Sequence, residues 1–206
     1  MATLLSKLLS SSHTLCYPVD ADNFLGFAMD ATLFLWIKEN LSPDSTILEF
    51  GSGTGTKELV KHYQVTSVEH SKEWLDVADT NYVYAPIDES RQWYSWESLT
   101  ELQNKTFDLI LVDGPHIDTR ENMKAWYQEN FQVFEDSIMI IDDNNYPEVQ
   151  GLIKIIKELG WHLVHQGGVQ QNHYWGVYRK YQECPECGAE YLKLSDMLSC
   201  CEQNFK

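Results

Sequence analysis

The sequence predicts an α/β fold: a doubly wound sheet of seven strands, mostly parallel, with a C-terminal antiparallel hairpin and helices on both faces. Three observations predict it. Short apolar runs alternate with helix-forming segments from residue 46 onward, which indicates parallel βα units. The last two strand-like runs, 161–166 and 173–180, have no helix between them, which indicates an edge hairpin. A glycine-rich turn follows the first strand, as in folds that bind a ligand at the strand ends.

The elements follow in order along the chain. A helix is expected over 22–39, where apolar residues recur at helical spacing, and a buried strand over 46–50, which is a short apolar run ending at a glycine. By the same criteria we expect strands at 65–69, 81–87, 107–114 and 137–143, and helices within 51–63 and at 71–80, 119–131 and 147–160.

The 206 residues suffice for one substantial domain. We divide the chain into an N-terminal helical cap over 1–45, the α/β domain over 46–181 and a cysteine-rich tail over 182–206. No apolar run approaches the roughly 20 residues of a membrane span. The leucine-rich start has no basic residue ahead of its apolar stretch, and Lys7 interrupts it, so we interpret it as a helix and not a signal peptide. These features and the clustered cysteines predict a cytoplasmic protein without membrane contact.

The glycine loop spans the end of the run ILEFGSGTG at 47–55, with Gly51, Gly53 and Gly55 at alternate positions. Glycines at such a turn let the chain bend sharply and let a ligand approach the backbone, because no Cβ occupies the space. The loop is therefore expected to contact a cofactor; a tight turn without a ligand is the alternative.

Two acidic residues accompany the loop. Glu69 ends the second strand, 18 residues after Gly51, where a carboxylate can accept hydrogen bonds from both hydroxyls of a ribose. Glu49 lies inside the first strand, where an unpaired carboxylate would be costly to bury, so it needs a donating or cationic partner. The cofactor is accordingly expected to contain a nucleoside.

The run 49–55 resembles the E/DxGxGxG signature of the class I S-adenosylmethionine-dependent methyltransferases, and VTSVEH resembles their acidic second-strand end. The likeness extends over about 46–180, including the terminal hairpin. It implies S-adenosylmethionine as the cofactor, with the loop around its methionyl part, Glu49 acting on its amino group through the loop, and Glu69 on the ribose. The cofactor-binding residues implied in this way are Glu49, Gly51, Ser52, Gly53, Gly55, Glu69 and, near the adenine, Asp88.

Other functions remain as alternatives. A dinucleotide enzyme would require GxGxxG, but Thr56 or Glu58 stands where the third glycine should be. A transferase that uses the decarboxylated cofactor would need acids arranged for a diamine, and no such pattern is visible. A noncatalytic nucleoside-binding module whose cysteine-rich tail docks a protein is the main alternative to an enzyme.

The candidate catalytic residues are Asp113, at the end of the fourth strand, and His116 in VDGPH. Methyl transfer needs an oriented acceptor and removal of its proton, and these two side chains could supply both. Alternatively, Asp113 with Asp143 and Asn144 could bind a divalent cation. That set resembles the cation-dependent catechol-type O-methyltransferases, whereas VDGP resembles an element of sugar methyltransferases. Capping of the following helix is the structural alternative.

The tail contains Cys184-Pro-Glu-Cys187, the knuckle spacing of structural zinc sites. Cys200 or Cys201 and a histidine such as His173 could complete a site, a second chain could share the zinc, or the thiols could be metal-free.

The charge balance is 15 Lys and Arg against 31 Asp and Glu, a net −16. Such a field disfavours polyanions. We therefore expect a methyltransferase acting on a small, oxygen-bearing acceptor, with no nucleic-acid partner; a homo-oligomer is compatible with the sequence.

Overall fold

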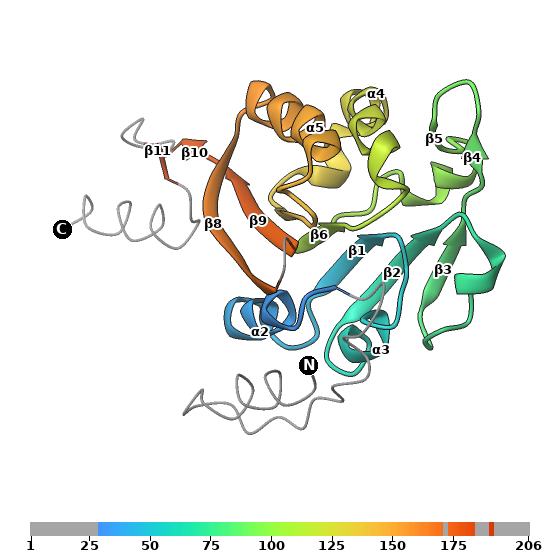
Figure 1. The fold of residues 1–206 in the computed structure, drawn as a ribbon, viewed down its shortest axis with the longest axis horizontal. Helices are drawn as coiled ribbons and strands as arrows, with labels where there is room; N and C mark the ends of the chain where they lie inside the picture. The colour runs from blue at the N-terminus through green and yellow to red at the C-terminus, as the bar shows by residue number, and fades with distance from the viewer. Residues whose placement is uncertain (1–28, 171–172, 184–189, 192–206) are drawn as a thin grey trace.

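The computed structural model describes residues 29–170, 173–183 and 190–191. A seven-stranded sheet in the order β3-β2-β1-β6-β7-β9-β8 forms its centre (Figure 1). Strands β3, β2, β1, β6 and β7 run parallel, and β9 and β8 form an antiparallel hairpin at one edge. The predicted fold class is therefore confirmed. The strands are β1 (Thr46–Phe50), β2 (Gln64–Glu69), β3 (Asn81–Tyr84), β6 (Leu109–Val112), β7 (Ile138–Ile141), β8 (Trp161–Gln170) and β9 (His173–Lys180).

Strands β6 and β7 are apolar along their whole length because both faces of the sheet are covered. In β6, Ile110 and Val112 belong to one hydrophobic cluster, and Leu109 and Leu111 belong to the cluster on the other face. All four side chains are fully buried. The sheet thus separates two cores.

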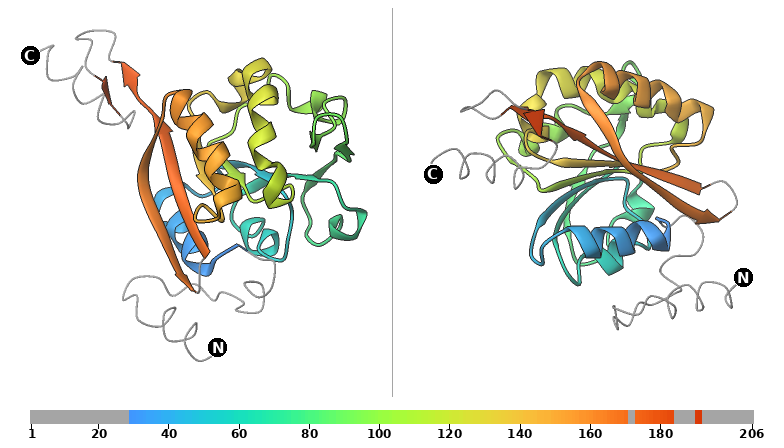
Figure 2. Two further views of the ribbon diagram at one scale, coloured as in Figure 1. Left: turned by 45° about the horizontal axis from the view of Figure 1, so that its top comes forward. Right: turned by 90° about the vertical axis from the view of Figure 1, so that its left-hand side faces the viewer.

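Helices cover both faces (Figures 1 and 2). On one face lie α4 (Met123–Glu129) and α5 (Pro147–Glu158), and on the other lie α2 (Ala31–Asn40) and α3 (Thr56–Leu59). The chain enters α2 at Asp30, whose carboxylate accepts a hydrogen bond of 2.7 Å from the Thr32 backbone N–H. Among the described residues, no helix is long and apolar enough to cross a bilayer.

The segment after β2 differs from the prediction. The helix expected over 71–80 is wrong: only Lys72–Trp74 form a single 3-10 turn. Leu75 is already extended and Asp76 adopts φ 70°, so the helix cannot continue. A small hairpin, β4 (Ile87–Asp88) and β5 (Trp93–Tyr94), then precedes the 3-10 helix Ser98–Leu102.

Parts of the two predicted flanking units lie outside the described residues, namely 1–28 of the helical cap and 184–189 and 192–206 of the tail. In the described part of the tail, β10 (Gln182–Glu183) pairs antiparallel with β11 (Glu190–Tyr191).

Candidate functional site

A cavity of about 530 Å³ lies where the carboxyl ends of β1, β2, β6 and β7 meet. This is the edge at which open α/β sheets bind ligands. Its lining comes from segments far apart in the chain: Gly51, Ser52, Glu69, His70, Trp74, Asp113, Gly114, Pro115, His116, Ile117, Arg120, Asp142, Asp143 and Tyr146.

The glycine loop begins with a close approach of two strand ends. Gly51 has φ 89°, and a Cβ built there would lie 2.8 Å from the Gly114 Cα atom. Only glycine satisfies both the left-handed conformation and this contact. Gly51 and Ser52 line the cavity, whereas Gly53 donates its N–H to Thr56 Oγ1 and Gly55 is the N-cap residue of α3.

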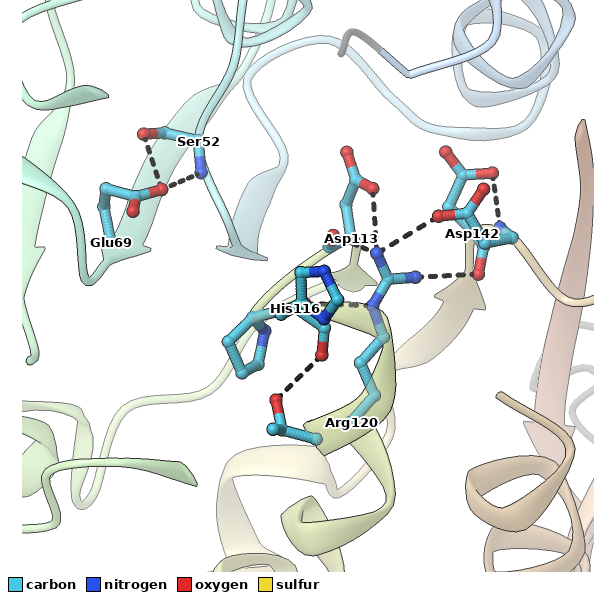
Figure 3. Close-up of polar contacts among 9 residues, drawn as sticks. Ser52, Glu69, Asp113, His116, Arg120 and Asp142 are labelled. Carbon is cyan, nitrogen blue, oxygen red and sulfur yellow. Dashed lines mark hydrogen bonds and ion pairs between the residues drawn. The ribbon is translucent and has the colours of Figure 1, made fainter. Parts of the chain in front are cut away.

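Glu69 ties the second strand to this loop (Figure 3). Its side chain is buried, and Oε2 accepts hydrogen bonds from the Ser52 backbone N–H at 2.9 Å and from Ser52 Oγ at 3.2 Å. Oε1 accepts from the backbone N–H groups of His70 and Ser71, both at 2.7 Å. The structure therefore brings the predicted Ser52 and Glu69 together and holds the carboxylate in one orientation at the cavity wall.

Glu49 lies behind the loop and outside the cavity lining. Its partners are hydroxyls: Thr56 Oγ1 donates at 2.9 Å and Ser67 Oγ at 2.7 Å. Burial raises the pKa of Glu49 to about 8, with the nearby Asp113 and Glu69 carboxylates adding to the effect. Because Thr56 also accepts the Gly53 N–H, Glu49 is coupled to the loop backbone through one hydroxyl. Its predicted role toward the cofactor amino group remains a prediction.

Asp113 lies at the end of β6, and its neighbours include a buried arginine (Figure 3). Arg120 is 4% exposed. Its Nη2 lies 3.5 Å from Asp113 Oδ1 and 3.2 Å from Asp143 Oδ2, and its Nη1 donates to the Asp142 carbonyl oxygen at 3.1 Å. Burial, together with Asp113 and Asp143, raises the pKa of Asp142 well above its usual range.

This arrangement does not support the predicted divalent-cation site. Asp113 and Asp143 are near each other, but the Arg120 guanidinium stands between their carboxylates. Asn144 is buried against β9, where its Nδ2 atom would lie 2.5 Å from a Cβ built at Gly176. Within the described ranges, no group of three His, Cys, Asp or Glu side chains is placed to hold a metal. Cys184, Cys187 and Cys200, the predicted zinc ligands, lie outside these ranges.

His116 and Asp88 occupy different surroundings. His116 lines the cavity at its mouth, with a side chain that is 74% exposed and an Nδ1 atom 3.5 Å from Asp118 Oδ2. Asp88 is outside the cavity lining: its carboxylate accepts hydrogen bonds from Ser90 and Arg91, which lower its pKa to about 2. The role of Asp88 near an adenine also remains a prediction.

The lining residues that sequence reasoning missed include His70, Trp74, Arg120 and Tyr146. His70 directly follows Glu69 in the sequence, so its place in the cavity lining could have been predicted from that of Glu69. Arg120 sits in a helical, polar stretch, TRENM, and nothing in its spacing distinguishes it from a solvated arginine.

By sequence, no protein-family model and no curated protein matches the chain. By structure, it is similar to ribosomal protein L11 methylase from Lactobacillus delbrueckii subsp. bulgaricus, with TM-score 0.54 and 12% identity over 75% of this chain and 84% of that one. It is also similar to Aeropyrum pernix fibrillarin with bound S-adenosyl-L-methionine, with TM-score 0.51 and 12% identity over 66% and 67%.

A third similar structure corrects the predicted partners. It is a proposed tRNA (m1A22) methyltransferase from Streptococcus pneumoniae, with TM-score 0.50 and 12% identity over 86% of this chain and 80% of that one. The expectation of a small-molecule acceptor and no nucleic-acid partner, which was deduced from the net charge, is therefore wrong. Net charge is a sum over the whole chain, and salt screens exposed charges beyond about 8 Å, so it does not decide what one surface binds. What these comparisons do establish is the architecture: the chain has the seven-stranded Rossmann-like fold of class I S-adenosylmethionine-dependent methyltransferases.

Proposed function

We propose that this protein binds S-adenosylmethionine and transfers its methyl group to a macromolecular acceptor. The observation that carries the proposal is the pairing of the loop after β1 with the acid that ends β2: the Ser52 backbone N–H donates to Glu69 at 2.9 Å, at the wall of a 530 Å³ cavity. A cavity of this size suits a nucleoside-containing cofactor. Of the three similar structures described above, fibrillarin holds the same cofactor, one is a ribosomal protein methylase and one is a proposed tRNA methyltransferase.

Different residues of the cavity lining would contact the cofactor and the acceptor. Gly51, Glu69, Asp113 and His116 all line the cavity; in this proposal the first two contact the cofactor, and the last two contact the acceptor. The bound cofactor supplies an electrophilic methyl group on a sulfonium. In this proposal Asp113, which is 25% exposed at its side chain, orients the acceptor and takes its proton, and His116 passes that proton to solvent.

Titration calorimetry tests the cofactor assignment. We expect S-adenosylmethionine to bind to the wild-type protein and NAD not to bind. Gly53→Asp, which adds a carboxylate to the loop, should abolish binding, and Glu69→Gln should weaken it at least about tenfold because one acceptor of a charged hydrogen-bond set is lost. Glu73→Gln, an exposed acid four residues from Glu69, removes the same charge and should bind normally. Unchanged affinity in both Gly53→Asp and Glu69→Gln would contradict the loop assignment.

Transfer is tested separately with tritiated cofactor and total protein or total tRNA from the source organism. Label in one of these fractions, lost in Asp113→Asn, is expected. Cofactor binding without label in either fraction would favour the noncatalytic binding module.

A further inference from the structure

Arg120 occupies an unusual place for a charged side chain. It comes from the 3-10 helix Ile117–Asn122, which follows the loop after β6, and it is 4% exposed. A buried guanidinium is costly unless its N–H groups are paired. Here they are paired: Nε donates to the Pro115 carbonyl oxygen at 3.2 Å, Nη1 to that of Asp142 at 3.1 Å, and Nη2 to that of Asp113.

These bonds connect the ends of two strands. Asp113 follows β6, Asp142 and Asp143 follow β7, and the guanidinium contacts all three residues at once (Figure 3). Among the described residues that line the cavity, Arg120 is the only arginine or lysine. The same lining contains four carboxyl groups, those of Glu69, Asp113, Asp142 and Asp143. Without Arg120, the carboxylates of Asp113 and Asp143 would repel each other in a partly buried site.

The position of the guanidinium is the one that the predicted divalent cation would need. A hard cation would have to lie within about 2.0–2.6 Å of oxygens from several of these residues. Arg120 Nη2 is already 3.2 Å from Asp143 Oδ2 and 3.5 Å from Asp113 Oδ1, so a metal ion bridging the same oxygens would meet a like charge at close range. The residues therefore do not fit a metal while Arg120 is in place.

We propose that Arg120 is a built-in cation: a positioning residue that holds Asp113 and Asp143 beside the space proposed for the acceptor, in the place where the sequence predicts a divalent cation. The part of this proposal that concerns the acceptor rests on the proposed function. The part that concerns the ion does not, because it follows from charge and geometry alone. Guanidinium suits this task because its planar fork donates in several fixed directions and it stays protonated.

Removing the guanidinium should leave the Asp113 and Asp143 carboxylates able to attract a divalent cation. In Arg120→Ala, the aspartates after β6 and β7 lose their shared cation, and we expect Mn²⁺ to bind at least about tenfold more tightly than to the wild type, since a repelling charge at close range is gone. Arg120→Lys retains a positive charge and should not gain Mn²⁺ binding. Arg91→Ala, which removes an exposed arginine paired with Asp88, is the matched control and should also gain none.

Electron paramagnetic resonance of free Mn²⁺ reads this binding without any methyl acceptor, and circular dichroism reports whether each variant is folded. A folded Arg120→Ala that gains no Mn²⁺ affinity overturns the proposal. The proposal is also overturned if the wild type binds Mn²⁺ and Asp113→Asn abolishes that binding. This second measurement tests the proposal if Arg120→Ala does not fold. Loss of the gained affinity in Arg120→Ala/Asp113→Asn would support it.

The two proposals fail in different ways. If the wild type does not bind S-adenosylmethionine, the proposed function is refuted, but the Mn²⁺ measurement still tests the role proposed for Arg120. If the cofactor binds and the wild type also takes Mn²⁺ through Asp113, the proposed function stands and the role of Arg120 is refuted.

Discussion

Replacing Glu49 with glutamine should remove a pH dependence from the stability of the cofactor-free protein. The carboxyl group is fully buried, and its pKa rises from 4.5 to about 8, first because of burial. In the unfolded chain the same group ionises near pH 4.5. Between these two values the folded protein retains a proton that the unfolded chain has lost, so the free energy of unfolding falls as pH rises.

The magnitude follows from the shift. A difference of about 3.5 pKa units, from 4.5 to about 8, corresponds to about 5 kcal/mol, or about 1.4 kcal/mol per pH unit across this window. The stabilisation is fully present below pH 4.5 and is lost as pH rises through 8. Glu49→Gln stays neutral throughout, and its amide can donate to Ser67 or Thr56, whose hydroxyls now donate to Glu49.

Urea denaturation at pH 5.5, 6.5 and 7.5 measures the effect. Over these two pH units the wild type should lose about 3 kcal/mol relative to Glu49→Gln. Glu97→Gln removes an exposed carboxylate and should follow the wild-type curve. Parallel pH profiles for wild type and Glu49→Gln would show that the buried carboxyl is already ionised in the folded state, and the reasoning would fail.

Two further substitutions test how the site is supported. Gly51→Ala and Gly160→Ala each place a side chain at φ near +89°, which costs about 1–2 kcal/mol, but only the Cβ at 51 would meet backbone, 2.8 Å from Gly114. Urea unfolding should therefore show a loss at 51 larger by at least about 1 kcal/mol, and equal losses would refute the close approach. Ser137→Ala removes a buried hydrogen bond of 2.6 Å to the Phe107 carbonyl oxygen and should cost about 1–3 kcal/mol in the same assay; a change below about 0.5 kcal/mol would contradict that bond.

Local sequence patterns were sufficient to predict the strand arrangement of this protein. The run TILEF ending at Gly51, and the acid that ends VTSVE, predicted the first two strands and the juxtaposition of the loop with Glu69. These inferences succeed because parallel strands place their carboxyl ends at one edge, so residues that end successive strands meet whatever the rest of the chain does. The failure over 71–80 has the opposite cause: helical propensity is weak, and the path from β2 to β3 overrode it.

Side-chain direction at the site was decided by tertiary structure alone. The sequence placed Asp113, Asp143 and Asn144 at neighbouring strand ends, but it could not show that Asn144 packs toward Gly176 on β9. Nor could it show that Arg120 folds back under the aspartates. Spacing along the chain determines which residues share an edge, whereas the partner that a buried charge finds depends on which groups from other segments surround it. The acids of the site could therefore be predicted from the sequence, and the cation that organises them could not.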